Sequence, residues 1–451
     1  MKPLLVYYVT SHGFGHATRA AAVAAVLERR GWRVHFRTRV PAWLFADEGL
    51  AAEVTPADVD PGVAMNDALR VDWPTALLEH EAFGTRWEET ADAEAGFLRR
   101  VGAVVAASDV GALGLDAARR AGIPGAALGN FSWDWIIAPK AAEDPRWEAV
   151  RRRMADAYAS AALFLHLPLG GDGPAFCARE AVPLVVRRPR LGRTAARSAM
   201  GLRADDARPL VAFSFGGVEG RPAARLVDDP LPDTVFAGYE PPPEGFRGEW
   251  RRLPNRAPLR HVDLMQAADA VLTKPGYGTF SEALAGRVPV LVVAREDFRE
   301  SAPIMASLRS LGRARIVERA DWEAGRWGAA LRGLLAADDP WTELDVSGAR
   351  LAMLRRGGVA LWDVLAACWR RGALDGAIRA PRPNDIPALL RRHPTLKAVF
   401  VNGRAAQGYL RRFHGAGMKV PVQYLPSSSP ANARGGFGVK LERWMTIRRW
   451  L

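Results

Sequence analysis

The chain has 451 residues, of which 49% are apolar and 25% are charged, an ordinary globular composition. This excludes a mostly disordered, collagen-like or disulfide-stapled protein, and at about 150 residues per domain the length predicts two or three domains. No apolar run approaches the roughly 20 residues that a membrane-spanning helix needs, and the N-terminus shows no signal-peptide pattern. The two cysteines, Cys177 and Cys368, lie far apart and predict buried, reduced thiols in a cytoplasmic protein.

The net charge of +13 is unevenly distributed along the chain. Residues 350–451 hold 19 Lys and Arg against 4 Asp and Glu, a net of +15, whereas residues 1–349 hold 43 against 45. This break predicts two modules with different partners, a neutral enzyme-like one and a basic one that meets polyanions. The alternative is an arginine-rich surface without function, although that would load both parts alike.

The first 190 residues alternate short apolar runs with helix-like segments. The run LLVYYV at 4–9 is typical of a buried parallel strand, and a glycine-rich turn follows it. Such alternation predicts a parallel sheet covered by helices, and so a Rossmann-like domain over residues 1–190. The expected strands are 4–9, 34–37, 103–107 and 125–128, and the expected helices are 17–30 and 116–121.

A basic, proline-containing stretch at 187–193 (RRPRLGR) predicts a linker between domains. A second alternation then begins and predicts a second α/β domain over 205–349, followed by a separate basic segment over 350–451. The expected strands are 210–215, 235–237, 270–273 and 288–294, and the expected helices are 264–268 and 279–286.

The segment 274–282 (KPGYGTFSE) joins an expected strand to an expected helix. Gly276 and Gly278 allow a tight turn whose N–H groups, with the helix start at Thr279, can bind phosphates. Lys274 adds a positive charge, and Glu282 lies one turn into the helix, where a carboxylate can bind a ribose diol. The alternative is a capping box between Thr279 and Glu282.

Two histidines, His12 and His16, lie in the glycine-rich turn after the first strand. Open α/β sheets bind ligands at the carboxyl ends of their strands. A histidine there can act as a general base on a sugar hydroxyl, and a structural histidine that caps the turn is the alternative. Asp109, after a later strand, is a candidate to orient His16 or to cap a helix.

The region around residues 274–290 resembles the donor-binding region of nucleotide-sugar glycosyltransferases with the GT-B fold. The resemblance implies an α/β protein with two Rossmann-like, doubly wound domains. It also implies an inverting transfer from a nucleotide-diphospho-sugar to an unknown acceptor hydroxyl, without metal or other cofactor. The implied donor-binding residues are Gly216, Gly217, Lys274, Gly276, Gly278, Thr279 and Glu282, with Asp297 and Glu300 as looser donor-sugar counterparts.

The N-terminal loop resembles the first loop of the same enzymes, whose Gly–His pair carries the base. Gly15 and His16 are the closer match, and His12 is the second choice. The phrase YYVTSHGFGHATR at 7–19 is still more similar to the glycosyltransferase-like domain of plant-type arabinokinases. No galactokinase-type phosphate loop follows, so arabinokinase activity itself is not implied.

An ordered series of motifs over 358–451, including the loop LPSSSPAN at 425–432, resembles the C-terminal part of hypoxanthine (deoxyinosine) DNA glycosylases of the uracil-DNA glycosylase superfamily. It implies a partial α/β domain that binds DNA non-specifically through its arginines. The family's water-activating loop has no counterpart in 330–357, so base excision is not expected. The rival functions are therefore a DNA-binding or base-excision protein and a catalytically silent nucleotide-sugar sensor. The implied DNA contacts are Asn402, Ser427, Ser428, Ser429 and Asn432.

Overall fold

The computed structural model describes residues 2–216, 231, 233–254, 259–310, 313–337, 358–360, 362–370, 378–415, 418–427 and 436–450. The chain divides into two compact units, Met1–Gly348 and Ala349–Leu451. Among the described helices, none has the length and apolar character needed to cross a membrane.

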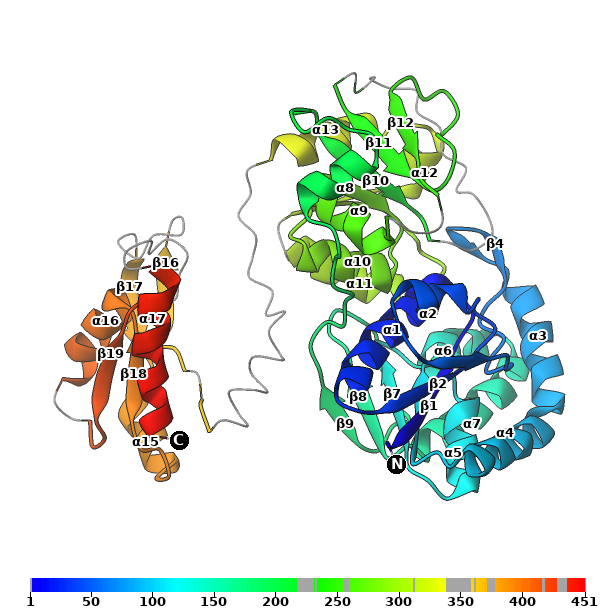
Figure 1. The fold of residues 1–451 in the computed structure, drawn as a ribbon, viewed down its shortest axis with the longest axis horizontal. Coiled ribbons are helices and arrows are strands. Elements are labelled where there is room, and N and C mark those ends of the chain that lie inside the picture. Colours follow the sequence, from blue (N-terminus) through cyan, green and yellow to red (C-terminus); the bar gives the residue numbers. More distant parts are fainter. Residues whose placement is uncertain are drawn as a thin grey trace. The chain divides into compact units, whose positions relative to one another are not determined.

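The first half of the first unit is a seven-stranded parallel sheet with the order β3-β2-β1-β6-β7-β8-β9 (Figure 1). The central strand β1 is buried along its whole length, which explains its continuous apolar run. The strands are β1 (Leu4–Val9), β2 (Arg33–Arg37), β3 (Glu53–Thr55), β6 (Val105–Asp109), β7 (Gly125–Gly129), β8 (Leu163–His166) and β9 (Arg179–Ala181), with a hairpin of β4 (Met65–Asp67) and β5 (Arg70–Val71). The helices are α1 (Phe14–Arg29), α2 (Trp43–Asp47), α3 (Trp73–Thr85), α4 (Trp87–Val101), α5 (Leu113–Ala121), α6 (Trp133–Glu143) and α7 (Pro145–Ala159).

The second half is a six-stranded parallel sheet with the order β12-β11-β10-β13-β14-β15. The two parallel sheets confirm the predicted doubly wound α/β class, although α9 and α10 each begin two or three residues before the predicted helices. The strands are β10 (Leu210–Ser214), β11 (Val235–Gly238), β12 (Glu249–Arg252), β13 (Ala270–Thr273), β14 (Val290–Val293) and β15 (Ala314–Val317). The helices are α8 (Arg193–Ala199), α9 (His261–Ala267), α10 (Tyr277–Ala285), α11 (Ser301–Ser310), α12 (Arg319–Glu323) and α13 (Gly328–Ala336).

Each sheet has a topological switch point, and the two switch points face each other. In the first sheet Val9, the end of β1, pairs with Asp109, the end of β6. In the second sheet Ser214, the end of β10, pairs with Thr273, the end of β13. Loops leave such neighbouring strands in opposite directions and open a crevice. Figure 1 shows α1 and α2 of the first half next to α9 and α10 of the second, and α1 contacts α10.

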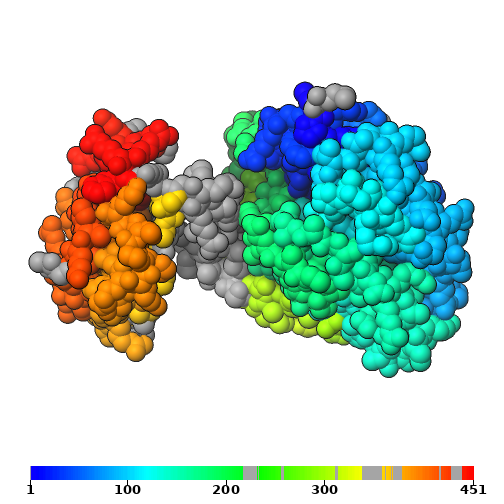
Figure 2. All heavy atoms as spheres, turned by 90° about the horizontal axis from the view of Figure 1, so that it is seen from below, coloured from blue at the N-terminus to red at the C-terminus, as the bar shows by residue number. Residues whose placement is uncertain are grey.

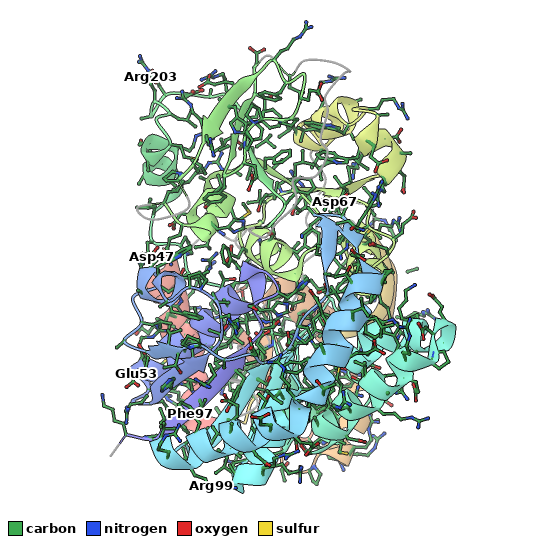
Figure 3. The ribbon with its side chains drawn as sticks, turned by 90° about the vertical axis from the view of Figure 1, so that its right-hand side faces the viewer. Asp47, Glu53, Asp67, Phe97, Arg99 and Arg203 are labelled. Atoms are coloured by element: carbon green, nitrogen blue, oxygen red, sulfur yellow. The ribbon has the colours of Figure 1, made fainter. Side chains whose placement is uncertain are left out.

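The β4–β5 hairpin of the first half packs into the core of the second half. Ala68 and Leu69, between its strands, are each 3% exposed in a cluster that includes residues of β10, β13 and β14. The backbone N–H of Val71 donates to the Asp297 carboxylate at 2.5 Å. Figure 3 shows Asp67, at the end of β4, at the level where the two halves meet. The hairpin therefore fastens the two halves together.

The second unit has an antiparallel pair of strands, a parallel pair and several helices. The apolar cluster of its described part is small and centres on Ile386, Val401 and Leu410. The C-terminal helix, red in Figure 2, packs on the last strand, and Trp444 Nε1 donates to the Pro426 carbonyl at 2.9 Å. The elements are β16 (Leu365–Arg370), β17 (Ile378–Pro383), α15 (Ile386–Arg392), β18 (Val399–Asn402), α16 (Arg404–His414), β19 (Val422–Leu425), α17 (Gly436–Trp444) and a 3₁₀ helix (Met445–Trp450).

Both cysteines are free, Cys177 in the first unit and Cys368 in the second. Both are exposed, so the prediction that they are buried is wrong. Neither thiol fills a core position. The apolar character of a cysteine side chain is therefore a weak guide to its burial.

We expect Gly114→Ala to lower the free energy of unfolding of the first unit by about 1–3 kcal/mol. A Cβ at Gly114, in α5, would lie 2.5 Å from the ring of the buried Tyr8, so the helix or the ring must move. Gly96→Ala in α4 is the matched control, because no atom lies within 4 Å of its Cβ position. It should gain about 0.5–1 kcal/mol from helix propensity. Urea unfolding of the full chain measures both, and equal stability of the two variants would contradict the packing argument.

Candidate active site

A histidine–carboxylate pair lies at the switch point of the first sheet. His16 Nδ1, in the first turn of α1, is 2.8 Å from Asp109 Oδ1 at the end of β6. Asp109 is fully buried, and although burial alone would raise its pKa, Arg19 and His16 hold the pKa below its usual range. Nδ1 also lies 3.2 Å from Arg19 Nη2, but its shorter contact is with the ionised carboxylate, which can only accept. In that contact Nδ1 donates, and the lone pair of His16 stands on Nε2. This is the geometry of an oriented general base.

Arg19 extends the pair into a chain of polar groups that reaches the second half. Its guanidinium donates to both oxygens of Asp109, from Nε at 2.8 Å and from Nη2 at 2.6 Å. Nη1 donates to Asn130 Oδ1 at 3.0 Å, and Asn130 Nδ2 donates to Glu300 Oε1 at 2.6 Å. Glu300 is buried, and burial raises its pKa. The chain therefore fixes the base and joins it to a residue beside α11.

The starts of α1 and α10 meet across the crevice between the halves. A Cβ on Gly278 would lie 3.2 Å from the Cα of Gly15, so this close backbone approach favours a glycine at 278. Both residues lie in the first turn of a helix, where backbone N–H groups lack intrahelical partners. Gly276, which precedes α10 as its N-cap, adopts an extended conformation. Two helix N-termini therefore converge on one place, an arrangement that favours anions.

Two cations, the half-buried Lys274 and the buried Arg295, lie beside these helix starts. Burial and, to a lesser extent, charge repulsion by Arg295 together lower the pKa of Lys274 to about 8. A Cβ on Gly216 would lie 3.6 Å from Lys274 Nζ, so the amine reaches the turn after β10. No carboxylate in the described ranges lies within ion-pair distance of Lys274. Arg295 is 5% exposed, and its Nε is 3.4 Å from Asp297. The sequence did not single out Arg295.

His12 lies on the same side of the crevice but lacks a carboxylate partner. Burial lowers its pKa to about 3, and the charges of His16, Arg295 and Lys274 act in the same direction. Its ring lies edge-on to Trp133 with centroids 6.0 Å apart. Among the described residues His12 has no carboxylate to orient it, whereas His16 has Asp109, so the geometry favours His16 of the two candidates.

A second ion network surrounds Glu282. Arg187 donates to its carboxylate from Nε at 2.7 Å and from Nη2 at 3.2 Å, and His261 Nδ1 donates at 2.8 Å. Burial alone would raise the pKa of Glu282, but Arg187 and His261 lower it to about 2. The same Arg187 and Arg260 both donate to Glu48, the residue that follows α2, at 2.9 and 2.6 Å. Glu282 therefore belongs to a clamp between the halves.

The predicted roles of Glu282 change accordingly. The capping box is wrong, because α10 begins at Tyr277 after Gly276 and has no side-chain cap. A ribose diol would have to share the Glu282 carboxylate with Arg187 and His261. His261 Nε2 in turn lies 2.8 Å from Ser214 Oγ, which donates to it because Nδ1 holds the ring proton. Thr279 lines a cavity with Glu282.

That cavity, of roughly 200 Å³, lies between the starts of α1 and α2 on one side and the ends of β10 and β11 on the other. Aromatic rings form part of its wall, with Phe14 and Trp43 edge-to-face at 5.9 Å and Tyr239 stacked on His261 at 6.2 Å. Its lining residues include Phe14, Gly15, Thr18, Trp43, Asp47, Glu48, Arg187, Ser214, Gly216, Tyr239, Glu240, Arg260, His261, Gly278, Thr279 and Glu282.

The remaining predicted residues have different surroundings. Asp297 accepts from Val71 of the hairpin, so it fastens the halves together, whereas Glu300 lies on the chain that leads to His16. In the second unit Asn402 ends β18, and Ser427 follows β19 beside Gly403. Among the described residues, no group of three His, Cys, Asp or Glu side chains is placed to hold a metal ion. Gly217, Ser428, Ser429 and Asn432 lie outside the described residues.

Sequence reasoning missed the groups that complete the site. Arg19, Asn130, Arg187, His261 and Arg295 all contact a predicted residue or lie beside one. Arg19 had a local sign, since it lies one helical turn after His16. Arg187 and His261 lie 95 and 21 residues from Glu282, and only the fold brings them to it.

No protein-family model matches the chain. It is 31% identical over 359 residues to the L-arabinokinase of Arabidopsis thaliana, an alignment that covers 77% of this chain and 34% of that protein. It is 38% identical over 85 residues to the hypoxanthine DNA glycosylase of Methanosarcina acetivorans, covering 19% of this chain and 52% of that one. The chain thus spans about a third of the first relative and half of the second.

Among solved structures, the spinosyn forosaminyltransferase SpnP matches with a TM-score of 0.50 at 12% identity, covering 79% of this chain and 94% of that one. The first unit has the GT-B fold. At this identity the likeness establishes the fold alone. The glycosylase-like fold of the second unit stays a prediction, since it rests on one short alignment.

Within the GT-B unit we expect Glu282→Gln to destabilise the folded state in a pH-dependent way. The pKa of Glu282 falls from its ordinary value of 4.5 to about 2 on folding. Its ionised form therefore stabilises the fold fully above about pH 4.5, and this contribution is lost as the pH falls towards 2. The variant should lose on the order of 2–4 kcal/mol at neutral pH and less at pH 3. Unfolding at both pH values measures this, with exposed Glu244→Gln as the control. A pH-independent loss would contradict the ionic role.

Proposed function

We propose that the first unit is a glycosyltransferase that uses a nucleotide-diphospho-sugar. The observation that carries the proposal is the convergence of two helix N-termini, the half-buried Lys274 and the buried Arg295 next to the His16–Asp109 pair. Anion binding and an oriented base at one crevice match the needs of sugar transfer from a diphosphate. The GT-B fold and the similarity to part of L-arabinokinase support a sugar-related substrate.

In the proposed reaction, His16 Nε2 removes the proton of the acceptor hydroxyl. The hydroxyl oxygen attacks the anomeric carbon of the donor sugar from the face opposite the diphosphate. The new glycosidic bond forms as the bond to the β-phosphate oxygen breaks, so the configuration inverts. The electron pair leaves with the nucleoside diphosphate, and the proton stays on His16 until solvent removes it.

The diphosphate would gain negative charge as it leaves, and the site offers several groups to bind it. Lys274 is the point charge closest to the turn at Gly216, and Arg295 lies beside it. The N–H groups at the starts of α1 and α10 add fixed dipoles that need no reorganisation during the reaction. With these groups in place, we propose that transfer does not need a metal ion.

We expect His16→Ala to reduce sugar transfer on the order of 100-fold or more while donor binding stays nearly unchanged, because the residue acts on the acceptor proton. Release of nucleoside diphosphate over an acceptor panel measures turnover, and calorimetry measures donor binding. His12→Ala is the matched control and should retain most activity. If His12→Ala is the damaging change, His12 is the base. Nucleotide binding by the wild type without turnover on any acceptor would instead indicate a silent sensor.

We expect the affinity for nucleoside diphosphates to fall by up to about tenfold between pH 7 and pH 9. The pKa of Lys274 is about 8, so the free site loses this charge as the pH rises through that value. Lys274→Arg should keep the charge and remove the pH dependence, and Lys274→Ala should bind weakly at every pH. Calorimetry across this pH range measures the effect, and an unchanged slope in the arginine variant would contradict the role of Lys274.

A second function is proposed for the basic unit, which carries a net charge of +15 over residues 350–451. Its helix α16 is strongly amphipathic in sequence (RAAQGYLRRFH), with Arg411, Arg412 and His414 in its last turn. We propose that this unit binds DNA through phosphate contacts, without base excision.

We expect binding of the full chain to duplex DNA to weaken with salt, with a slope of about −0.9 in log K against log salt for each phosphate contacted. Hypoxanthine or uracil in the duplex should change neither affinity nor strand integrity after alkali, because the sequence of residues 330–357 contains no counterpart of the water-activating loop. A fluorescence titration with both duplexes measures binding. Deoxyinosine-dependent cleavage that disappears on deleting residues 350–451 would overturn this view, and salt-insensitive binding would show that the arginines only cover a surface.

A further inference from the structure

The cavity beside Glu282 contains an excess of hydrogen-bond acceptors. Four carboxylates line it, Asp47, Glu48, Glu240 and Glu282, and so do two arginines, Arg187 and Arg260. Both arginines are already bound to Glu48, and Arg187 also binds Glu282. Both arginines of the lining are thus paired with Glu48 or Glu282 in the clamp. The other two carboxylates have no such partner among the described residues.

These two remaining carboxylates, Asp47 and Glu240, face the cavity from opposite walls. Asp47 is the last residue of α2 in the first half, and Figure 3 shows it at the level where the halves meet. Glu240 follows the end of β11 by two residues, and its backbone carbonyl is fixed by Trp250 Nε1 at 3.0 Å. Neither side chain forms a hydrogen bond or ion pair with any residue in the described ranges. Both are only partly exposed, so their acceptor capacity is open to a ligand.

The rest of the wall fits a planar ring with a sugar attached. The edge-to-face pair Phe14–Trp43 and the stacked pair Tyr239–His261 supply apolar faces. The same cavity is lined by Gly216, and by Gly278 and Thr279 of the helix start, so it is continuous with the proposed diphosphate site. Its volume of roughly 200 Å³ is smaller than a drug-sized pocket and is of the order needed for a nucleoside.

The nucleobases differ in what they offer to a carboxylate. An ionised carboxylate only accepts, and it binds best to two donors side by side. Guanine presents N1–H and the 2-amino group next to each other. Uracil and thymine present one N–H between two carbonyl oxygens. A carboxylate that accepts from this N–H would be repelled by both oxygens. Adenine and cytosine each present an amino group beside an unprotonated ring nitrogen, so each offers a carboxylate one amino donor and not two donor groups side by side. Among its described lining residues the cavity has free carboxylates and no free cation, and this combination favours guanine.

We infer that the donor of this enzyme is a guanosine diphosphate sugar, whose base is recognised by Glu240 and Asp47. The inference rests on the proposed function, since it names the nucleotide of the same site. It assigns these two carboxylates to specificity, and leaves diphosphate binding to Lys274 and the two helix starts.

The test is calorimetry on the full chain with the diphosphates of guanosine, inosine, uridine and adenosine. Guanosine diphosphate should bind at least tenfold more tightly than uridine or adenosine diphosphate. Inosine diphosphate, which lacks the 2-amino group, should bind several-fold more weakly than guanosine diphosphate. The double variant D47N/E240Q should lose at least tenfold in affinity for guanosine diphosphate and keep its affinity for uridine diphosphate within about twofold. Glu244→Gln, an exposed change in the same loop as Glu240, is the control and should behave as the wild type.

The outcomes separate this inference from the function on which it rests. Tighter or equal binding of uridine or adenosine diphosphate, with loss on Lys274→Ala, overturns the guanine assignment and leaves the glycosyltransferase proposal in place. A guanine preference that persists in the double variant overturns the role of the two carboxylates. No binding of any of these four diphosphates, or of cytidine diphosphate tested beside them, overturns both proposals.

Discussion

The backbone contact between Gly15 and Gly278 is the constraint on which the site depends. Each residue lies in the first turn of its helix. The contact therefore brings two positive helix ends to one point, with Lys274 and Arg295 beside them. Like charges so close together are unfavourable while the crevice holds only water, and an anion relieves the repulsion. The packing of the two sheets thus holds several positive groups close together, and a bound diphosphate would neutralise them.

A buried ion network, the clamp, fixes the elements around the cavity. It consists of Glu48, Arg187, Arg260 and Glu282. All four side chains are at most 9% exposed, and taking them out of water costs several kcal/mol for each ion before pairing returns most of it. Such a network is a poor source of net stability, but it tolerates few alternative arrangements. Its effect is to fix α2 and the interdomain segment against α9 and α10, and so to shape the cavity between them.

The sequence predicted those features whose causes are local. The apolar run of β1, the glycine turn before α1 and the alternation of strands and helices each depend on neighbouring residues. The general rule that neighbouring strand ends meet at one edge of the sheet placed the histidine turn and Asp109 near each other, whereas the choice of His16 came from the resemblance of its loop to GT-B enzymes. Lys274 and Gly278 were predicted in the same way, since they directly follow a strand.

The features that were not predicted depend on distant pairs. Glu48 and Arg260 are 212 residues apart, and nothing near either residue marks it as buried. In a chain with many arginines, Arg187 in a proline-containing basic stretch looks like a solvated linker residue. Glu282 was predicted from its helical position alone, which says nothing of the two cations that the fold brings to its carboxylate. The hairpin at 65–71 was missed because its strands are too short for a periodic pattern.

That hairpin has a consequence for how substrates enter. Two-domain enzymes often open by a hinge, and the linker is then the only tie between their halves. Here Leu69 of the first half is buried in the apolar core of the second, at a cost of about 1.5–3 kcal/mol to withdraw it. Full separation of the halves would therefore be populated roughly ten- to a hundredfold less than in a simply hinged pair. Motions that open the crevice while Leu69 stays in that core are therefore favoured over full separation of the halves.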